Sequence, residues 1–148
     1  SFLTMRSYDD EITYQLAGAA SEVLGAPVEA CLEMFGEYWV LETASKTYAS
    51  LMDASGTSLQ EFLSNLNALH DRITGTFLNY IPPEFRIEDL GGDRHRIHYI
   101  SQRQGLTPFV VGLLNGLAKR YDNELDILEQ RSVPVDSGEH TVFEVTLT

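Results

Sequence analysis

Apolar residues recur at helical spacing along residues 58–80, which carry the most regular pattern in the chain. Ser58 followed by Glu61 has the spacing of a capping box, so the pattern predicts that a helix begins there. One face of this helix is apolar and is formed by Phe62, Leu63, Leu66, Leu69, Ile73 and Phe77. His70 lies in the middle of that face. A histidine aimed at an apolar interior needs a partner, which is either a backbone carbonyl in the core or a metal or cofactor iron.

Apolar periodicity predicts further helices on both sides of this stretch. Acidic residues open a helix at Asp9, and Gly25 closes it. The next helix runs from Pro27 to about Glu42, and a short one covers residues 46–54. A last helix is predicted for residues 108–121. It is strongly apolar, and its small residues would let a neighbouring helix pack closely.

Four later stretches alternate apolar and polar residues, as strands with one buried face do, and these are residues 85–90, 94–103, 124–133 and 140–148. The residues Gly91–Gly92–Asp93 predict a hairpin turn between the first two. Helices therefore come first, followed by a hairpin, a helix and a second hairpin. We expect an α+β fold in which N-terminal helices pack on a helix plus a four-stranded antiparallel sheet.

Composition narrows the classes of function. The chain has 148 residues, enough for one domain with a substantial core, and a net charge of −12. This acidic balance argues against nucleic acid and against an anionic membrane as partners. The single cysteine, Cys31, excludes an internal disulfide and a zinc site built on several thiolates. No apolar run is long enough to span a bilayer and no signal peptide is visible, so a cytoplasmic protein is expected.

Three hydrogen-bond donors alternate on the strand predicted for residues 94–103. Tyr99, Ser101 and Arg103 would point to the same side, spaced roughly 7 Å apart. A row of phenol, hydroxyl and guanidinium groups is suited to bind carboxylates or phosphates, and the alternative is a solvated strand face. A large flat ligand with two carboxylates and a metal centre would use both this row and His70.

The other aromatic and histidine residues do not decide whether His70 and the donors on the strand bind a ligand or have only structural roles. The FGEYW stretch at Phe35–Trp39 either fills the core or forms the wall of a ligand pocket. His95 and His98 are three residues apart on a strand, so they face opposite sides, and His140 lies where a loop meets a strand. We expect no second metal site from these histidines.

The order of these motifs resembles that of the heme–nitric oxide/oxygen binding (H-NOX) family, which includes the heme domain of soluble guanylate cyclase. The FGEYW stretch is similar to that of stand-alone bacterial members, and the resemblance covers essentially all 148 residues. It rests on Leu69–His70, on Pro82–Pro83, and on Tyr99-x-Ser101-x-Arg103 followed by Gly105–Leu106 and an apolar helix.

The resemblance implies heme b (iron protoporphyrin IX) as cofactor, held between the helical and sheet parts. It implies a single domain over residues 1–148, with residues 1–57 on the distal side and residues 58–148 forming the proximal part. His70 matches the proximal iron ligand, and the propionate-binding residues match Tyr99, Ser101 and Arg103.

Further positions match residues around the porphyrin. Pro83 matches a proline that distorts the macrocycle, while Phe109 and Leu113 match the helix that contacts the porphyrin and the distal pocket. Trp39 matches a distal aromatic residue of some bacterial members. Oxygen-binding members have a tyrosine where this chain has Phe109, and a phenyl ring donates no hydrogen bond. The family also has a pair of short helices that would precede Ser1, so either the sequence is incomplete or the pocket is more open than usual.

These matches imply a heme-based gas sensor in which ferrous iron binds nitric oxide and carbon monoxide. The implied partner is a signalling protein, such as a histidine kinase or a cyclic-nucleotide enzyme, and the chain itself is not expected to be an enzyme. Three alternatives remain at this point. They are a peroxidase-like or oxygen-activating heme enzyme, an oxygen sensor that uses Trp39, and a heme-free protein-interaction domain.

Overall fold

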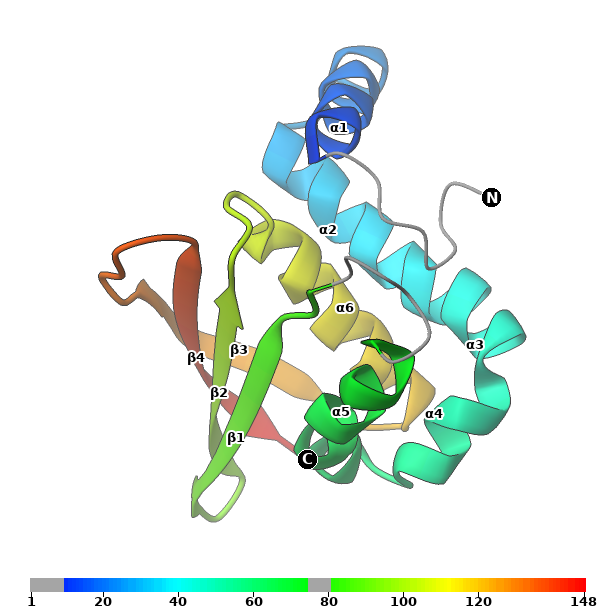
Figure 1. The fold of residues 1–148 in the computed structure, drawn as a ribbon, viewed down its shortest axis with the longest axis vertical. Helices are drawn as coiled ribbons and strands as arrows, with labels where there is room; N and C mark the ends of the chain where they lie inside the picture. The colour runs from blue at the N-terminus through cyan, green and yellow to red at the C-terminus, as the bar shows by residue number, and fades with distance from the viewer. Residues whose placement is uncertain (1–9, 75–80) are drawn as a thin grey trace.

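The computed structural model describes residues 10–74 and 81–148. Helices and an antiparallel sheet occupy different sides of the molecule (Figure 1), which confirms the α+β class. None of the helices in these ranges is both long and apolar enough to cross a membrane. The elements in chain order are α1 (Asp10–Leu24), α2 (Val28–Tyr38), a π-helix (Trp39–Ala44), α3 (Ser45–Thr47), α4 (Ala49–Ser55), α5 (Leu59–Thr74), β1 (Glu84–Gly91), β2 (Arg94–Ser101), α6 (Thr107–Arg120), β3 (Leu125–Ser132) and β4 (Glu139–Leu147).

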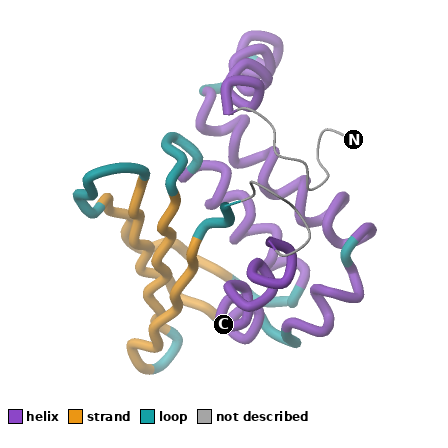
Figure 2. The backbone as a smooth tube through the Cα atoms, in the orientation of Figure 1, coloured by secondary structure: helices purple, strands orange, loops and turns teal. Residues whose placement is uncertain are grey.

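The sheet has four antiparallel strands in the order β1-β2-β4-β3, so β1 and β3 are its edges. The predicted turn near Gly92 joins β1 to β2 as a hairpin. In the register, Tyr99 of β2 lies opposite Phe85 of β1 and Thr141 of β4. The helices lie on one side of this sheet (Figure 2). The alternation of buried and exposed positions along β2 follows from that one-sided cover.

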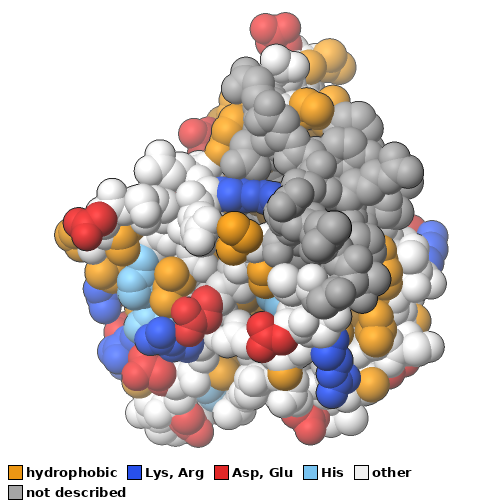
Figure 3. All heavy atoms as spheres, viewed as in Figure 1, with side chains coloured by type: hydrophobic (Ala, Val, Ile, Leu, Met, Phe, Trp, Pro, Cys, Tyr) orange, Lys and Arg blue, Asp and Glu red, His pale blue; other side chains and the backbone are white. Residues whose placement is uncertain are grey.

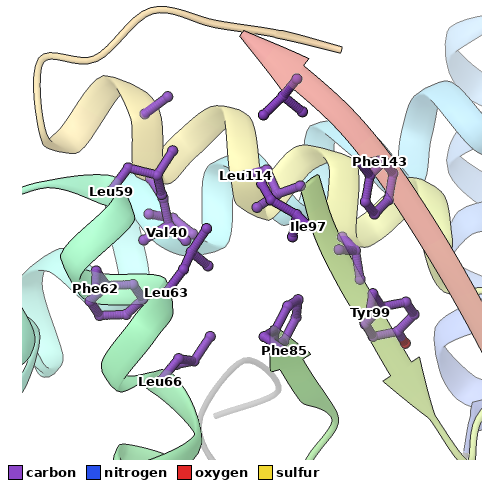
Figure 4. Close-up of a cluster of buried hydrophobic side chains, with 14 of the residues drawn as sticks. Val40, Leu59, Phe62, Leu63, Leu66, Phe85, Ile97, Tyr99, Leu114 and Phe143 are labelled. Carbon is purple, nitrogen blue, oxygen red and sulfur yellow. The ribbon is translucent and has the colours of Figure 1, made fainter. Parts of the chain in front are cut away.

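The core lies between α5, α6 and the covered face of the sheet. Leu63 of α5, Leu114 of α6 and Phe143 of β4 are at most 2% exposed. Figure 4 shows Leu63 and other α5 side chains directed toward the side chains of the sheet. Within the described part of the helix, the predicted apolar face of Phe62, Leu63, Leu66 and Leu69 is therefore the face that packs on the core, while Phe77 lies outside the described residues.

Three predicted helices differ from the structure. The helix predicted to reach Glu42 changes at Trp39 into a π-helix, a wider turn that is frequent at functional sites. The helix predicted for residues 46–54 is divided at Tyr48, whose φ of −120° and ψ of 23° are not helical. The helix predicted for residues 58–80 is observed as far as Thr74, and the rest of that prediction falls on residues 75–80, outside the described residues.

Helices α2 and α6 make the most extensive contact between any two of the described elements, and they cross in Figure 1. Their backbones touch at two glycines. A Cβ atom at Gly36 would lie 2.2 Å from the carbonyl oxygen of Phe109, and one at Gly112 would lie 2.0 Å from the carbonyl oxygen of Glu33. The prediction that small residues of the helix at 108–121 let a neighbouring helix pack closely is thus confirmed, and the neighbour is α2.

The first prediction concerns this glycine contact. Gly112→Ala is expected to lower the free energy of unfolding by about 1–3 kcal/mol or more, because α2 would have to move away from the new methyl group. Gly18→Ala in α1 is the matched control, since a Cβ atom there would have no neighbour within 4 Å. That change should stabilise the protein by roughly 0.5–1 kcal/mol, because alanine is the better helix former.

Urea denaturation of the two alanine variants measures both effects. Equal unfolding midpoints for Gly112→Ala and the wild type would show that the two helix backbones are not in contact.

Candidate functional site

Helix α5 carries His70, the proposed ligand residue of the candidate site. The helix begins at a cap in which Ser58 Oγ accepts a hydrogen bond from the Glu61 N–H at 3.2 Å. The Glu61 carboxylate accepts a hydrogen bond from the Thr57 N–H at 2.7 Å rather than from Ser58 itself. The predicted capping box is therefore present in a form shifted by one residue. Leu66 and His70 are one turn apart on this helix; Leu66 is buried, and His70 is partly buried on the same side.

The His70 imidazole is largely buried, and its Nδ1 atom has no hydrogen-bond partner among the described residues. Burial lowers the pKa of His70, and this effect exceeds the opposing effects of a hydrogen bond with the Pro83 backbone and of the charge on Asp71. The ring is therefore neutral at pH 7. Buried polar atoms are nearly always paired, so the unpaired Nδ1 leaves one ring nitrogen available to a ligand, whereas the hydrogen bond with the Pro83 backbone is a contact that a core histidine would also make.

Asn67 joins α5 to the start of β1. Its Nδ2 donates a hydrogen bond to the Phe85 carbonyl at 2.7 Å, and its Oδ1 accepts one from the Phe85 N–H at 2.9 Å. Asn67 precedes His70 by three residues and Phe85 follows Pro83 by two, so these hydrogen bonds help to keep the Pro83 backbone beside the imidazole. The sequence analysis missed Asn67, whose only signal was an amide just under one turn before a buried histidine.

Phe85 lies between His70 and the donor row. Its ring centroid is 6.5 Å from that of His70 and 5.5 Å from that of Tyr99. Figure 4 shows Phe85 and Tyr99 on adjacent strands, with Phe85 nearer to the apolar side chains of α5. The sequence analysis predicted the strand but not this role for Phe85, because the register between β1 and β2 decides which residue faces Tyr99.

The donor row is less regular than the sequence predicted. Strand β2 ends at Ser101 and residues 102–105 form bends, so Arg103 lies beyond the strand. The prediction that all three residues alternate on one strand is therefore wrong for Arg103. The chain has to turn here because α6 begins at Thr107, and Ser101 Oγ supports the turn by accepting a hydrogen bond from the Arg103 N–H at 3.1 Å.

The structure nevertheless brings Tyr99, Ser101 and Arg103 close together. Tyr99 is 2% exposed, and burial, aided by the charge of Glu139, raises the pKa of its phenol despite the hydrogen bond with Ser101 and the charge of Arg103, which lower it. The phenol is therefore protonated at neutral pH and can donate a hydrogen bond. Phenol, hydroxyl and guanidinium groups meet at the end of β2, where they can bind the carboxylates of a ligand.

The residues expected on the distal side come from two helices that are in contact. Trp39 begins the π-helix that follows α2, and Phe109 and Leu113 are one turn apart on α6. Trp39 and Leu113 pack against the core that includes Leu66 and Tyr99, and Phe109 is partly buried. Among the three expected residues, only the Trp39 indole carries a hydrogen-bond donor in its side chain.

These residues fit heme. A neutral imidazole with an unpaired nitrogen is a suitable iron ligand, and it projects from an apolar helix face. The donors at the end of β2 suit a pair of propionates, and the remaining candidates, Trp39, Phe109 and Leu113, supply mainly apolar surface. These residues therefore offer a nitrogen for a metal, donors for carboxylates and apolar surface, which are the groups that a flat amphipathic cofactor needs.

The other histidines form a separate arrangement. The His95 side chain is buried, whereas on the other face of the sheet His98 Nδ1 is 3.2 Å from His140 Nε2. This confirms that His95 and His98 face opposite sides, but the contact with His140 was not predicted. His98 Nε2 also lies 2.7 Å from a Glu88 carboxylate oxygen. Histidines lie among acidic and basic side chains on the sheet side of the molecule (Figure 3). Over residues 10–74 and 81–148, no group of three or more metal-ligating side chains could hold an ion.

Comparison with known proteins gives one family over most of the chain. The sequence model described as Haem-NO-binding matches residues 1–129. Soluble guanylate cyclase gcy-37 of Caenorhabditis elegans is 34% identical over 147 residues, which cover 93% of this chain and 20% of that protein. The beta-2 subunit of the soluble guanylate cyclase of Rattus norvegicus is 32% identical over 121 residues, covering 78% and 18%. The chain thus spans about a fifth of the length of these relatives.

Solved structures share the fold. One is an oxygen-binding H-NOX domain related to soluble guanylate cyclases, in its oxygen complex. It matches with a TM-score of 0.80 and 20% identity over 97% of this chain and 74% of that chain. An H-NOX protein from S. oneidensis in the Fe(II)NO ligation state matches with a TM-score of 0.77 and 16% identity, covering 97% and 78%. At these identities the likeness concerns the fold.

The His98–His140 contact predicts a pH dependence of stability. Burial and the neighbouring His98, Arg86 and Arg131 side chains lower the pKa of His140, and only Glu84 opposes them. The unfolded chain therefore binds a proton on His140 at higher pH than the folded protein does. The free energy of unfolding should fall as the pH drops below about 6.5, and His140→Gln should weaken this fall.

Urea denaturation of the heme-free protein at about pH 7.5 and about pH 5.5 measures this difference. If the variant and the wild type lose the same stability between the two pH values, His140 does not contribute to it.

Proposed function

Because the chain belongs to the Haem-NO-binding family, we propose that it is a heme-based sensor of nitric oxide and carbon monoxide that signals to a partner protein by a change of conformation. The observation that carries this proposal is the buried His70 imidazole, whose Nδ1 has no hydrogen-bond partner among the described residues. The domains of this family are sensors rather than catalysts, so the proposal gives this chain no catalytic residues.

The proposed cofactor is heme b, which when bound supplies the ferrous iron that binds the gas. His70 is the proposed iron ligand. Tyr99, Ser101 and Arg103 are proposed to donate hydrogen bonds to the propionates, for which a protonated phenol and a permanent cation are suited. Support comes from the burial of Tyr99 and from the hydrogen bond between Ser101 Oγ and the Arg103 N–H.

Four residues are proposed to shape the cavity around the cofactor. Pro83, which adjoins His70, would press on the macrocycle and hold it off planar. Phe109 and Leu113 would face the gas ligand, and neither side chain can donate a hydrogen bond. Bound dioxygen is polar and gains from such a donor, so these residues favour nitric oxide and carbon monoxide. The indole of Trp39 is the one candidate donor among the four.

We further propose how the signal leaves the site. Residues 1–57 would cover the distal side and residues 58–148 would form the proximal part of one domain. Asn67 couples α5 to β1 through two hydrogen bonds, so a displacement of His70 on binding would reach the sheet. The partner would be a histidine kinase or a cyclic-nucleotide enzyme. The named relatives are soluble guanylate cyclases, and the chain spans about a fifth of their length.

Replacing His70 tests the cofactor assignment. His70→Gly is expected to purify with little heme and to regain it when free imidazole is supplied, because the small base can occupy the vacated space. The absorption spectrum near the Soret band measures heme content. His95→Gly is the matched control, because it removes another buried imidazole and should keep its heme. Normal heme content of His70→Gly without imidazole would exclude the assignment.

Gas selectivity tests the distal residues. The reduced protein should form complexes with nitric oxide and carbon monoxide but no stable complex with dioxygen in air. Phe109→Tyr adds a hydroxyl group and should tighten oxygen binding by up to about tenfold, the value of one hydrogen bond. Optical titration measures these affinities. A long-lived oxygen complex of the wild type that is lost in Trp39→Phe would instead make Trp39 the distal donor.

A further inference from the structure

The segment between β2 and α6 carries Arg103, and β4 holds one side of it. Glu139 Oε2 accepts a hydrogen bond from the Gly105 N–H at 3.0 Å, and Glu139 Oε1 accepts one from the Thr107 hydroxyl at 2.6 Å. The backbone of Gly138 packs against Ser101, where a Cβ atom would lie 2.1 Å from the Ser101 carbonyl oxygen. This side of the segment is therefore fixed to the sheet.

Helix α1 holds the other side through Tyr14. The Tyr14 hydroxyl donates a hydrogen bond to the carbonyl oxygen of Gln104, which directly follows Arg103. The Tyr14 ring lies against Gly105, so that a Cβ atom there would be 3.5 Å from the ring atom Cε1. Gly105 has a φ of 79°, which favours glycine and leaves its Cα face open to the ring. A residue of the N-terminal helices thus reaches the segment that carries one of the three donors.

Tyr14 also lies close to the rest of the donor row. Burial is the main reason that the pKa of Tyr99 is raised, and Arg103 and Tyr14 are both near enough to act on the same phenol, Arg103 lowering its pKa and Tyr14 raising it slightly. The Arg103 N–H donates to Ser101 Oγ, and the carbonyl of the following residue, Gln104, accepts from the Tyr14 hydroxyl. Two successive anchors therefore fix the backbone on either side of the Arg103 Cα atom.

We propose that Tyr14 is a positioning residue for the proposed heme site, in that its hydrogen bond to Gln104 holds the backbone from which Arg103 binds a propionate. The inference rests on the proposed function and adds to it a residue from α1. Its physical basis is that a guanidinium group on a flexible chain loses conformational entropy when it binds. A backbone that is already ordered before binding reduces that loss of entropy, so the propionate is bound more tightly.

The test removes only the hydroxyl group. Tyr14→Phe keeps the ring against Gly105 but cannot donate to Gln104. It should speed the transfer of heme to an acceptor protein by about two- to tenfold, the value of one hydrogen bond. In an Arg103→Ala background the same change should have no effect, because the donor that Tyr14 positions is gone. Tyr38→Phe, on the exposed part of α2, is the matched control and should leave the rate unchanged.

A second readout needs no heme. Amide hydrogen exchange of residues 102–106 in the heme-free protein should be faster in Tyr14→Phe than in Tyr38→Phe, while exchange in β2 stays the same. An unchanged heme-transfer rate in Tyr14→Phe would overturn the inference. So would an equal acceleration with and without Arg103, which would indicate a general loss of stability. If Arg103→Ala alone leaves heme transfer unchanged, the propionate role of Arg103 fails, and this inference fails with it.

Discussion

The paired hydrogen bonds between Asn67 and the backbone of Phe85 join the helix of His70 to the sheet of Tyr99. Apolar contacts between α5 and the sheet are non-directional, so they alone would not fix how far one slides along the other. An amide that satisfies both the N–H and the carbonyl of one residue does fix it, and losing it would leave both backbone groups unpaired. The His70, Phe85 and Tyr99 rings, and with them the candidate heme site, take their order from this one connection.

Much of the fold could be predicted because it depends on the periodic spacing of apolar residues within single segments of the chain. The apolar face of α5, the alternation of the strands and the turn at Gly92 each need only neighbouring residues, and each is present in the structure. His70 could be identified for the same reason, since its helix face follows from spacing alone. The roles of His70, Tyr99 and Ser101 toward a cofactor rest on the family resemblance and stay predictions.

Other features depend on contacts between distant segments, and no local pattern contains them. The partnership of Asn67 with Phe85 and the contact of Tyr14 with Gln104 are set by how α5, β1 and α1 are placed. Alternation continues past Ser101 in the sequence, yet the strand ends there because the chain must turn into α6. The change to a π-helix at Trp39 likewise occurs beside α6, in tertiary surroundings that propensity does not describe.

The contact at Gly36 and Gly112 constrains how the distal side can respond. Side chains between two helices can exchange rotamers and let the helices slide, but main chains that touch directly have no rotamers to exchange. Helices α2 and α6 therefore have a single crossing geometry and behave as one rigid pair. Phe109 and Leu113 belong to α6, and Trp39 directly follows α2. A displacement of α6 at Phe109 or Leu113 therefore requires α2 to move with it, because the two main chains are in direct contact.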